Sequence, residues 1–319
     1  MMYLLILLGV VVAAYLYANA NPVIATRKCL SVASYLCGMR KASVLVDHYE
    51  WHYLDSDDGT GKPVVLLVHG YGADKESWLG YARLLTSSYR VIAPDLPGFG
   101  LSDRNVFDDY SPRSQAQRLA LFCRVLNLRD LHVAGSSMGG YICSWFAIDH
   151  GHYVASLTLM NAAGVFGATA SGVQQAAEAG NNLLLIKNEQ DFMNLLKLLT
   201  PKPPFMPAFM RRYAVQNYLE HGDQLDTIFW QLAEAQQQDG LQASLSDINV
   251  PTLIVWGDSD QVIDVSCVDV FDEAIGDSET LIFAGKGHIP MFEAPVQTAR
   301  RQKQLIERAR SSSHVSTVS

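Results

Sequence analysis

The run LHVAGSSMGG, residues 131–140, constrains the fold more than any other stretch of the chain. Its apolar first half is typical of a buried strand, and the residues after the glycines favour a helix. A strand that turns sharply into a helix needs residues without side chains around the bend. A Gly-x-Ser-x-Gly bend meets that need and presents its central serine at the helix N-terminus. Ser137 is therefore the candidate nucleophile, and Ser136 is a structural alternative.

From residue 43 onward the chain alternates short apolar runs with segments of helical spacing. Continuous apolar strands separated by helices are typical of a mostly parallel, doubly wound sheet that is covered on both faces. The pattern therefore predicts an α/β fold. The predicted strands cover residues 43–47, 50–54, 63–68, 90–93, 131–134, 155–160, 252–256 and 280–283.

The strand pattern stops between residues 164 and 250, where helical segments and the proline cluster TPKPPFMPAFM occur instead. We expect residues 164–250 to form a helical cap or lid inserted into the α/β core, which would comprise residues 23–163 and 251–310. Residues 311–319 are predicted to be a flexible tail. The apolar residues of 183–199 have helical spacing, so they either pack on the core, line an acyl-chain tunnel or form a membrane-facing lid.

The first residues, MMYLLILLGVVVAAYLYANANPV, contain no charged side chain before Arg27. As a helix, about 20 such residues would cross a bilayer, so residues 1–22 are predicted to be a single-pass transmembrane anchor. A cleaved signal peptide is the alternative, because Ala18-Asn19-Ala20 resembles a cleavage site. Against cleavage, no basic residue precedes the run, and the run exceeds the usual hydrophobic length.

The membrane side of the rest of the chain stays open. Basic residues after the span, including Arg27 and Lys28, favour a cytoplasmic catalytic domain, but large exported domains can override this tendency. Small residues at Gly9, Ala13 and Ala14 would allow a homodimer through the span. The net charge of −8, from 24 basic and 32 acidic residues, argues against nucleic acid as a partner.

Glycines and ionisable residues follow almost every predicted strand, so they converge on one edge of the sheet, where doubly wound folds place their sites. A serine nucleophile needs a base and an acid. In the chain order Ser–Asp–His the base comes last, which favours His288 over His69. Asp260 is the preferred acid because it lies far enough beyond its strand to turn back over the edge. Asp258 and Asp264 are the alternatives.

The oxyanion of the transition state needs N–H donors aimed at it. The Gly-x-Ser-x-Gly bend is called a nucleophile elbow. Its geometry assigns this role to the backbone N–H groups of Met138 and of a residue in the loop after His69-Gly70, for which Tyr71 is the candidate. The chemistry requires no metal or cofactor. The five cysteines contain no CxxC pair, which disfavours a metal site or a disulfide framework.

These motifs together resemble the α/β-hydrolase superfamily. The segments that carry the resemblance are HGYG at 69–72, DLPGFGLS at 95–102, GSSMGG at 135–140, WGDSDQVID at 256–264 and GHIPMFEAP at 287–295. The uncharged N-terminal run, HGYGADKESW and WGDSDQVID are most similar to membrane-anchored monoacylglycerol lipases and bacterial membrane-bound esterases and phospholipases A1. That resemblance implies Ser137, Asp260 and His288 as a catalytic triad.

The resemblance and the motifs predict a membrane-anchored serine hydrolase of fatty-acyl esters, with a monoacylglycerol or a lyso- or diacyl phospholipid as substrate. Carbon–carbon bond hydrolases share the same Ser-His-Asp set, so a soluble-substrate esterase or a carbon–carbon hydrolase is an alternative. A non-catalytic ligand-binding homologue is a further alternative. Loss of a triad residue would mark it, and all three are present.

Overall fold

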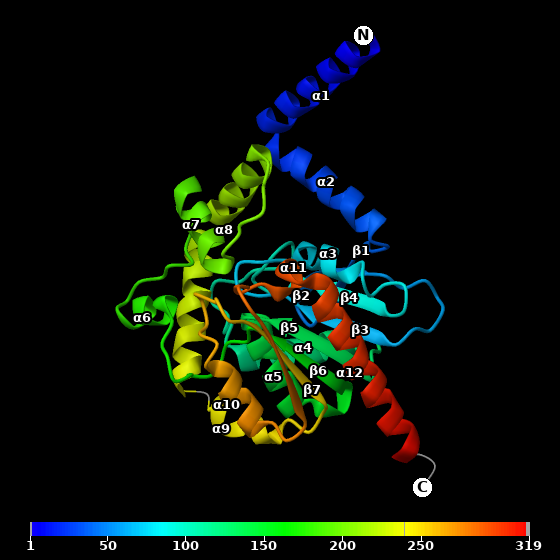
Figure 1. The fold of residues 1–319 in the computed structure, drawn as a ribbon, viewed down its shortest axis with the longest axis vertical. Coiled ribbons are helices and arrows are strands. Elements are labelled where there is room, and N and C mark those ends of the chain that lie inside the picture. The colour runs from blue at the N-terminus through cyan, green and yellow to red at the C-terminus, as the bar shows by residue number, and fades with distance from the viewer. Residues whose placement is uncertain (1, 239, 317–319) are drawn as a thin grey trace.

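The computed structural model describes residues 2–238 and 240–316 of the 319-residue chain. Its centre is a twisted sheet with the strand order β1-β2-β4-β3-β5-β6-β7-β8 (Figure 1). The β1–β2 and β2–β4 pairs are antiparallel, and the other pairs are parallel. The strands are β1 (Arg40–Val46), β2 (Tyr49–Asp55), β3 (Val64–Val68), β4 (Arg90–Pro94), β5 (Leu131–Ser136), β6 (Val154–Met160), β7 (Thr252–Gly257) and β8 (Ser278–Phe283). The predicted mostly parallel α/β sheet is confirmed.

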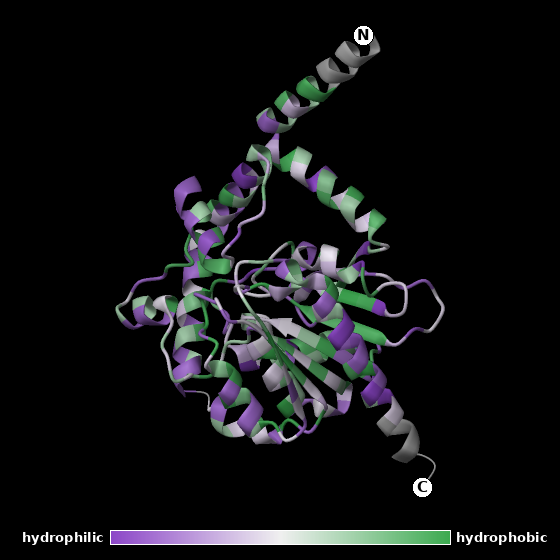
Figure 2. Ribbon diagram, in the orientation of Figure 1, coloured by the Kyte–Doolittle hydropathy of each residue, from purple (hydrophilic) through white to green (hydrophobic). Residues whose placement is uncertain are grey.

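The strands are apolar throughout because both faces of the sheet are covered. In β3, Leu66 and Val68 pack into one core while Val65 and Leu67 pack into the other. Figure 2 shows the hydrophobic central strands between more hydrophilic outer helices. Each large apolar side chain buried in this way contributes about 1.5–3 kcal/mol to folding.

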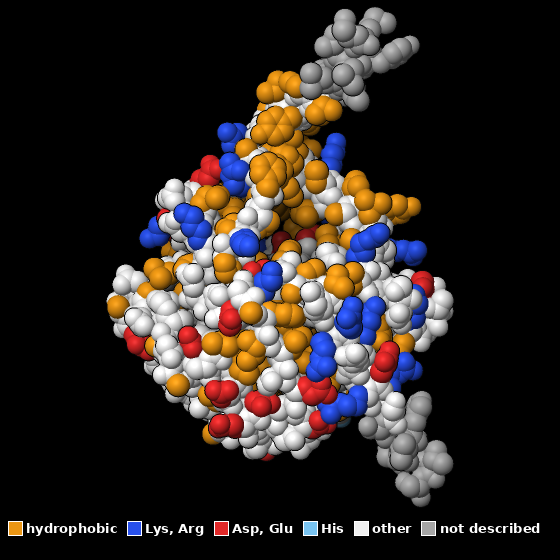
Figure 3. Space-filling view, in the orientation of Figure 1, with side chains coloured by type: hydrophobic (Ala, Val, Ile, Leu, Met, Phe, Trp, Pro, Cys, Tyr) orange, Lys and Arg blue, Asp and Glu red, His pale blue; other side chains and the backbone are white. Residues whose placement is uncertain are grey.

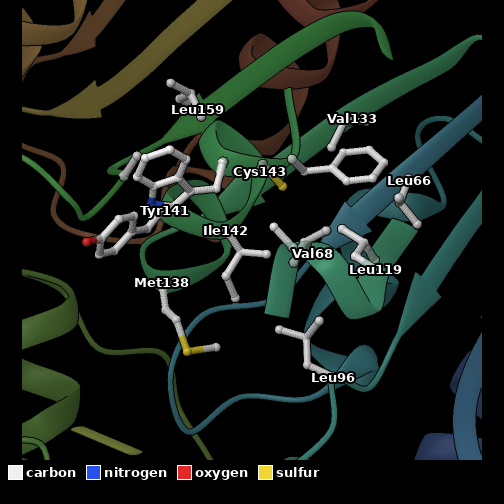
Figure 4. Close-up of a cluster of buried hydrophobic side chains, with 14 of the residues drawn as sticks. Leu66, Val68, Leu96, Leu119, Val133, Met138, Tyr141, Ile142, Cys143 and Leu159 are labelled. Atoms are coloured by element: carbon white, nitrogen blue, oxygen red, sulfur yellow. The ribbon is translucent and has the colours of Figure 1, made fainter. Parts of the chain in front are cut away.

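Helices α4 (Pro112–Val125), α5 (Met138–Asp149) and α10 (Cys267–Ala274) cover the face of Leu66 and Val68. Figure 4 shows this core around α5, with Tyr141, Ile142 and Cys143 directed into it. The other face is covered by the 3₁₀ turn η1 (Lys75–Trp78), α3 (Leu79–Ala82) and α12 (Pro295–Ser316). Two short elements, η2 (Gly151–Tyr153) and α11 (Pro290–Glu293), complete this part of the chain.

Between β6 and β7 the described chain forms α6 (Gly172–Glu178), α7 (Glu189–Leu199), α8 (Ala208–Gln238), α9 (Leu241–Ser244) and the 3₁₀ turn η3 (Leu245–Asp247). These helices occupy the segment expected to be the cap. The Tyr218 hydroxyl of α8 donates to the Gly72 carbonyl at 3.0 Å, and the Tyr71 hydroxyl donates to the Leu225 carbonyl at 2.8 Å. These bonds place α8 over the loop that follows β3.

The N-terminal segment is broken into two helices, α1 (Met2–Ala20) and α2 (Pro22–Leu36). The break falls where Pro22, which lacks an N–H, occupies the first turn of α2. Side chains of residues 1–10, which make up much of the anchor expected over residues 1–22, lie outside the described part. Among the described residues we find no helix with the length and hydrophobicity needed to cross a bilayer.

The C-terminal helix is longer than the sequence suggests. Helix α12 continues to Ser316, so it extends into the segment from residue 311 that was expected to be a flexible tail. Residues 317–319 of that segment lie outside the described residues. Ala299, Leu305 and Ile306 fix the first part of α12 against the sheet.

Candidate active site

Ser137 stands at the junction of β5 and α5 in a strained backbone conformation, with φ 56° and ψ −121°. A side chain at either neighbouring glycine would collide with backbone atoms. A Cβ at Gly135 would lie 2.2 Å from the Gly139 carbonyl oxygen, and a Cβ at Gly139 would lie 2.2 Å from the Val68 carbonyl oxygen. The sequence pattern therefore exists because this bend has no room for side chains. Strain of this kind is typical of functional sites.

The two serines of the bend have different surroundings. Ser136 is 2% exposed, and its hydroxyl lies 3.9 Å from the Met291 sulfur. Ser137 is only partly buried and lines two cavities of the protein. Ser136 lines one of these cavities as well, whereas Ser137 lines both.

His288 and Asp260 form a buried pair beyond the ends of β8 and β7. His288 Nδ1 donates to Asp260 Oδ2 at 2.7 Å, and the two side chains are 4% and 0% exposed. The other oxygen of Asp260 accepts the backbone N–H groups of Val262 at 2.8 Å and Ile263 at 3.1 Å. These bonds keep the carboxylate in place, and the carboxylate fixes the tautomer that leaves Nε2 of His288 free to accept a proton. His288 lines one of the two cavities that reach Ser137.

Asn161, directly after β6, is a site residue that the sequence reasoning passed over because it is not an acid. Its Nδ2 donates to Asp260 Oδ2 at 2.6 Å and to the Gly287 carbonyl at 3.3 Å. It is fully buried and has a positive φ of 46°, a conformation that asparagine tolerates well. In the sequence, a polar residue directly after a buried strand, at the edge where the other site residues lie, is the signal that could have indicated Asn161.

The alternative acids and the alternative histidine have other partners. The Asp258 carboxylate accepts the Gly285 N–H at 2.7 Å, and the Asp264 carboxylate accepts the Ser266 N–H at 2.9 Å. Both bonds organise loops. His69 Nδ1 donates to the Gly70 carbonyl at 2.8 Å, and its Nε2 accepts the Leu96 N–H at 3.1 Å. Burial lowers the pKa of His69, so the neutral ring supports the loop after β3.

The loop after β3 brings Tyr71 close to the serine bend. A Cβ at Gly70 would lie 3.3 Å from the Ser137 Cβ, so only a glycine allows this approach without displacing a neighbour. A buried ion pair fixes the end of this loop: Lys75 Nζ lies 2.6 Å from Asp95 Oδ2. Met138 begins α5, so its N–H lies at the positive end of a helix dipole. Its side chain is buried in the core (Figure 4).

The two cavities differ in their walls. The elbow-side cavity, of about 420 Å³, is bounded by Met138, Tyr141 and Val165, together with α6 and the second half of α8. The histidine-side cavity, of about 570 Å³, is bounded by His288, α7 and the chain between α7 and α8. Ser137 and Tyr71 line both. Among residues 2–238 and 240–316, no group of three His, Cys, Asp or Glu side chains could hold a metal ion.

The chain is similar to several known proteins. The family model for the alpha/beta hydrolase fold matches residues 63–295. Lipase 3 of Moraxella sp. (strain TA144) is 33% identical over 252 residues, which are 79% of each chain. Monoacylglycerol lipase abhd6-A of Xenopus laevis is 28% identical over 272 residues, which are 82% of this chain and 81% of the relative.

A solved structure described as a membrane phospholipase A and bacterial virulence factor is also similar. It has a TM-score of 0.87 and 36% sequence identity, and the match covers 97% of this chain and 98% of that one. The family match covers most of the chain and includes the bend, the buried His–Asp pair and strands β3 to β8. The chain therefore belongs to the α/β-hydrolase family and is a serine ester hydrolase.

Proposed function

We propose that Ser137, His288 and Asp260 form a catalytic triad that cleaves fatty-acyl esters through an acyl-enzyme. The observation that carries this proposal is the buried 2.7 Å bond between His288 and Asp260, with His288 lining a cavity that also reaches Ser137. A histidine held in this way by a carboxylate can accept the serine proton through Nε2. Asn161 and two backbone N–H groups hold the carboxylate.

In this mechanism the Ser137 Oγ attacks the ester carbonyl carbon while His288 takes the hydroxyl proton. Asp260 stabilises the imidazolium that results. The backbone N–H groups of Tyr71 and Met138 stabilise the negative oxygen of the tetrahedral intermediate. His288 then gives its proton to the leaving alcohol. A water molecule activated by His288 attacks the acyl-enzyme, which releases the fatty acid and regenerates Ser137.

The proposed substrate is a monoacylglycerol or a lyso- or diacyl phospholipid. Two cavities lined largely by apolar side chains favour a substrate with hydrocarbon chains. The names of the relatives, two lipases and a membrane phospholipase A, point to the same class of ester.

We also propose that the N-terminal segment, residues 1–22, anchors the enzyme to a membrane. The described part of α1 exposes Val11, Tyr15 and Leu16, each at more than half of its surface. Figure 3 shows apolar side chains along this helix, with lysine and arginine side chains near its base. Apolar surface beside basic residues suits a membrane with anionic lipids.

The test is hydrolysis by the full-length protein in detergent. Monoacylglycerols, lysophospholipids, diacyl phospholipids and short p-nitrophenyl esters are the substrates. Ser137→Ala should lower kcat by a factor of about 10⁴–10⁶ without unfolding the protein. Ser136→Ala is the matched control and should lose far less activity. Release of long-chain fatty acid by Ser137→Ala at the wild-type rate would refute the proposed nucleophile. Activity confined to short esters would refute the lipid substrate.

A further inference from the structure

The elbow-side and histidine-side cavities meet at Ser137 but do not share His288. We propose that the elbow-side cavity holds the acyl chain and that the histidine-side cavity holds the leaving alcohol. We further propose that this alcohol itself carries a hydrocarbon chain, as does the lysolipid released from a two-chain glycerolipid. This inference rests on the proposed function, since it assumes that Ser137 and His288 act on an ester.

The assignment follows from the four substituents of the tetrahedral intermediate. One is the Ser137 Oγ, and the second is the oxyanion, which points to the N–H groups of Tyr71 and Met138. The third is the alcohol oxygen, which must lie within hydrogen-bond reach of His288 Nε2 to receive its proton. Since His288 lines only the larger cavity, the alcohol extends there. The acyl chain, the fourth substituent, is left with the elbow-side cavity.

The walls of the histidine-side cavity indicate the chemistry of the alcohol. Apolar side chains supply most of its surface, among them Phe192, Leu195, Leu196, Leu199, Met206 and Met291, whereas Asp74, Lys202, Lys286 and Glu293 add charged groups to its wall. Its volume of about 570 Å³ exceeds that of the elbow-side cavity. Both volumes lie in the range that encloses a whole drug-sized ligand. A bare glycerol would leave most of this apolar surface without contacts, whereas an alkyl chain would cover it.

Two ester series separate the two cavities. The first keeps the octanoyl group and lengthens the alcohol from ethyl to butyl, hexyl, octyl and decyl. The second keeps the ethyl group and lengthens the acyl chain from acetyl to decanoyl. Simple primary alcohols leave with similar ease, so a trend along the first series reports binding. In the wild-type enzyme, kcat/KM should rise about fourfold per methylene in both series until each cavity is filled.

Helix α8 offers a matched pair of positions. Ala233 lines only the elbow-side cavity, and Ala214 lines only the histidine-side cavity. Ala233→Trp should flatten the acyl series while the alcohol series keeps its wild-type slope. Ala214→Trp should do the reverse. Rates are divided by each variant's rate on ethyl acetate, the shortest ester of the acyl series. Ala233→Phe and Ala214→Phe replace any tryptophan variant that fails to fold.

The outcomes distinguish this inference from the proposed function. If Ala233→Trp flattened the alcohol series and Ala214→Trp the acyl series, or if neither variant changed a slope, the assignment would be overturned while Ser137-dependent hydrolysis stands. A wild-type alcohol series without a slope would overturn the chain-bearing alcohol. No Ser137-dependent hydrolysis of any ester would overturn the proposed function, and the assignment with it.

Discussion

At the scale of single residues, the choice between Asp260 and Asp258 turns on which carboxylate reaches the histidine. Asp260 bonds to His288, whereas Asp258 bonds to the Gly285 N–H. Asp260→Asn should lower kcat/KM by a factor of about 10³–10⁴, because an amide cannot stabilise the imidazolium or enforce the tautomer. Asp258→Asn is the control and should cost little activity. Steady-state kinetics on a short ester decide the matter, and the reverse ranking would reassign the acid.

Asn161 is expected to act through Asp260 as a positioning residue. Asn161→Gly keeps the positive φ accessible but removes the amide that donates to Asp260 and to the Gly287 carbonyl. We expect kcat to fall by about tenfold or more with little change in KM, because substrate contacts are retained while the base is less well oriented. Asn127→Gly, at another positive-φ asparagine, controls for the backbone change. Equal losses in both variants would show a merely structural role.

At the scale of elements, the strands were predictable because burial on both faces leaves continuous apolar runs. Each predicted strand overlaps an observed one. Helix α2 was not predicted, since it combines the last residues of the uncharged N-terminal run with the charged Arg27 and Lys28 and so shows no single pattern. Only Pro22 marks the break, and a proline in a first turn is compatible with either one kinked helix or two helices. The extent of α12 was missed because a serine-rich end carries no apolar stripe to predict a helix.

The turn η1 after β3 carries a prediction for the pH dependence of stability. Burial, together with the carboxylates of Glu76 and Asp95, raises the pKa of Asp74 to about 7. In the unfolded chain this pKa is about 3.9. The folded state therefore holds the proton more tightly. The stabilisation that results from this raised pKa of Asp74 is complete below about pH 4 and is lost as the pH rises through 7.

Asp74→Asn should therefore raise the free energy of unfolding by about 1–2 kcal/mol at alkaline pH and leave it unchanged near pH 4. The amide oxygen can still accept the Glu76 N–H, which the carboxylate accepts at 3.1 Å. Urea unfolding at several pH values measures the difference. Asp109→Asn is a control of opposite sign: burial raises the pKa of Asp109, but hydrogen bonds from Ser114 and Ser111 outweigh it and lower that pKa. A destabilised Asp74→Asn at alkaline pH would contradict the argument.

At the scale of the whole molecule, the sequence could indicate the site because parallel strands end at one edge. Ser137, Asp260 and His288 follow β5, β7 and β8, so topology brings them to that edge. The cavities could not be predicted in the same way. Spacing alone left the cap residues of 183–199 as core or tunnel, and residues such as Leu195 and Leu196 do both, since they pack on the core and line a cavity.

Both N-terminal helices contact α8 of the catalytic body. Deletion of residues 1–20 removes α1 but keeps Asn21 and Pro22, so α2 can still form. The proposed anchor predicts that this variant leaves the membrane fraction, whereas the full chain sediments with it. Activity on a short ester should persist. Helix α1 contacts α8 near Arg212, which donates to the Asn19 carbonyl at 3.3 Å. This contact lies far along α8 from Leu225, whose carbonyl accepts the Tyr71 hydroxyl beside the site.

Deletion through Leu36 provides the comparison. It also removes α2, which packs against α8 and places Leu30 and Ala33 against the core on the Val65 and Leu67 face of the sheet. The melting temperature of this longer deletion should fall by several degrees, since loss of buried apolar contacts costs about 0.8 kcal/mol per methylene. If the shorter deletion alone abolished short-ester hydrolysis, α1 would be needed to hold α8 in its position over the active site. If the shorter deletion still sedimented with membranes, the binding surface would lie on α2 or the cap, and not on residues 1–20.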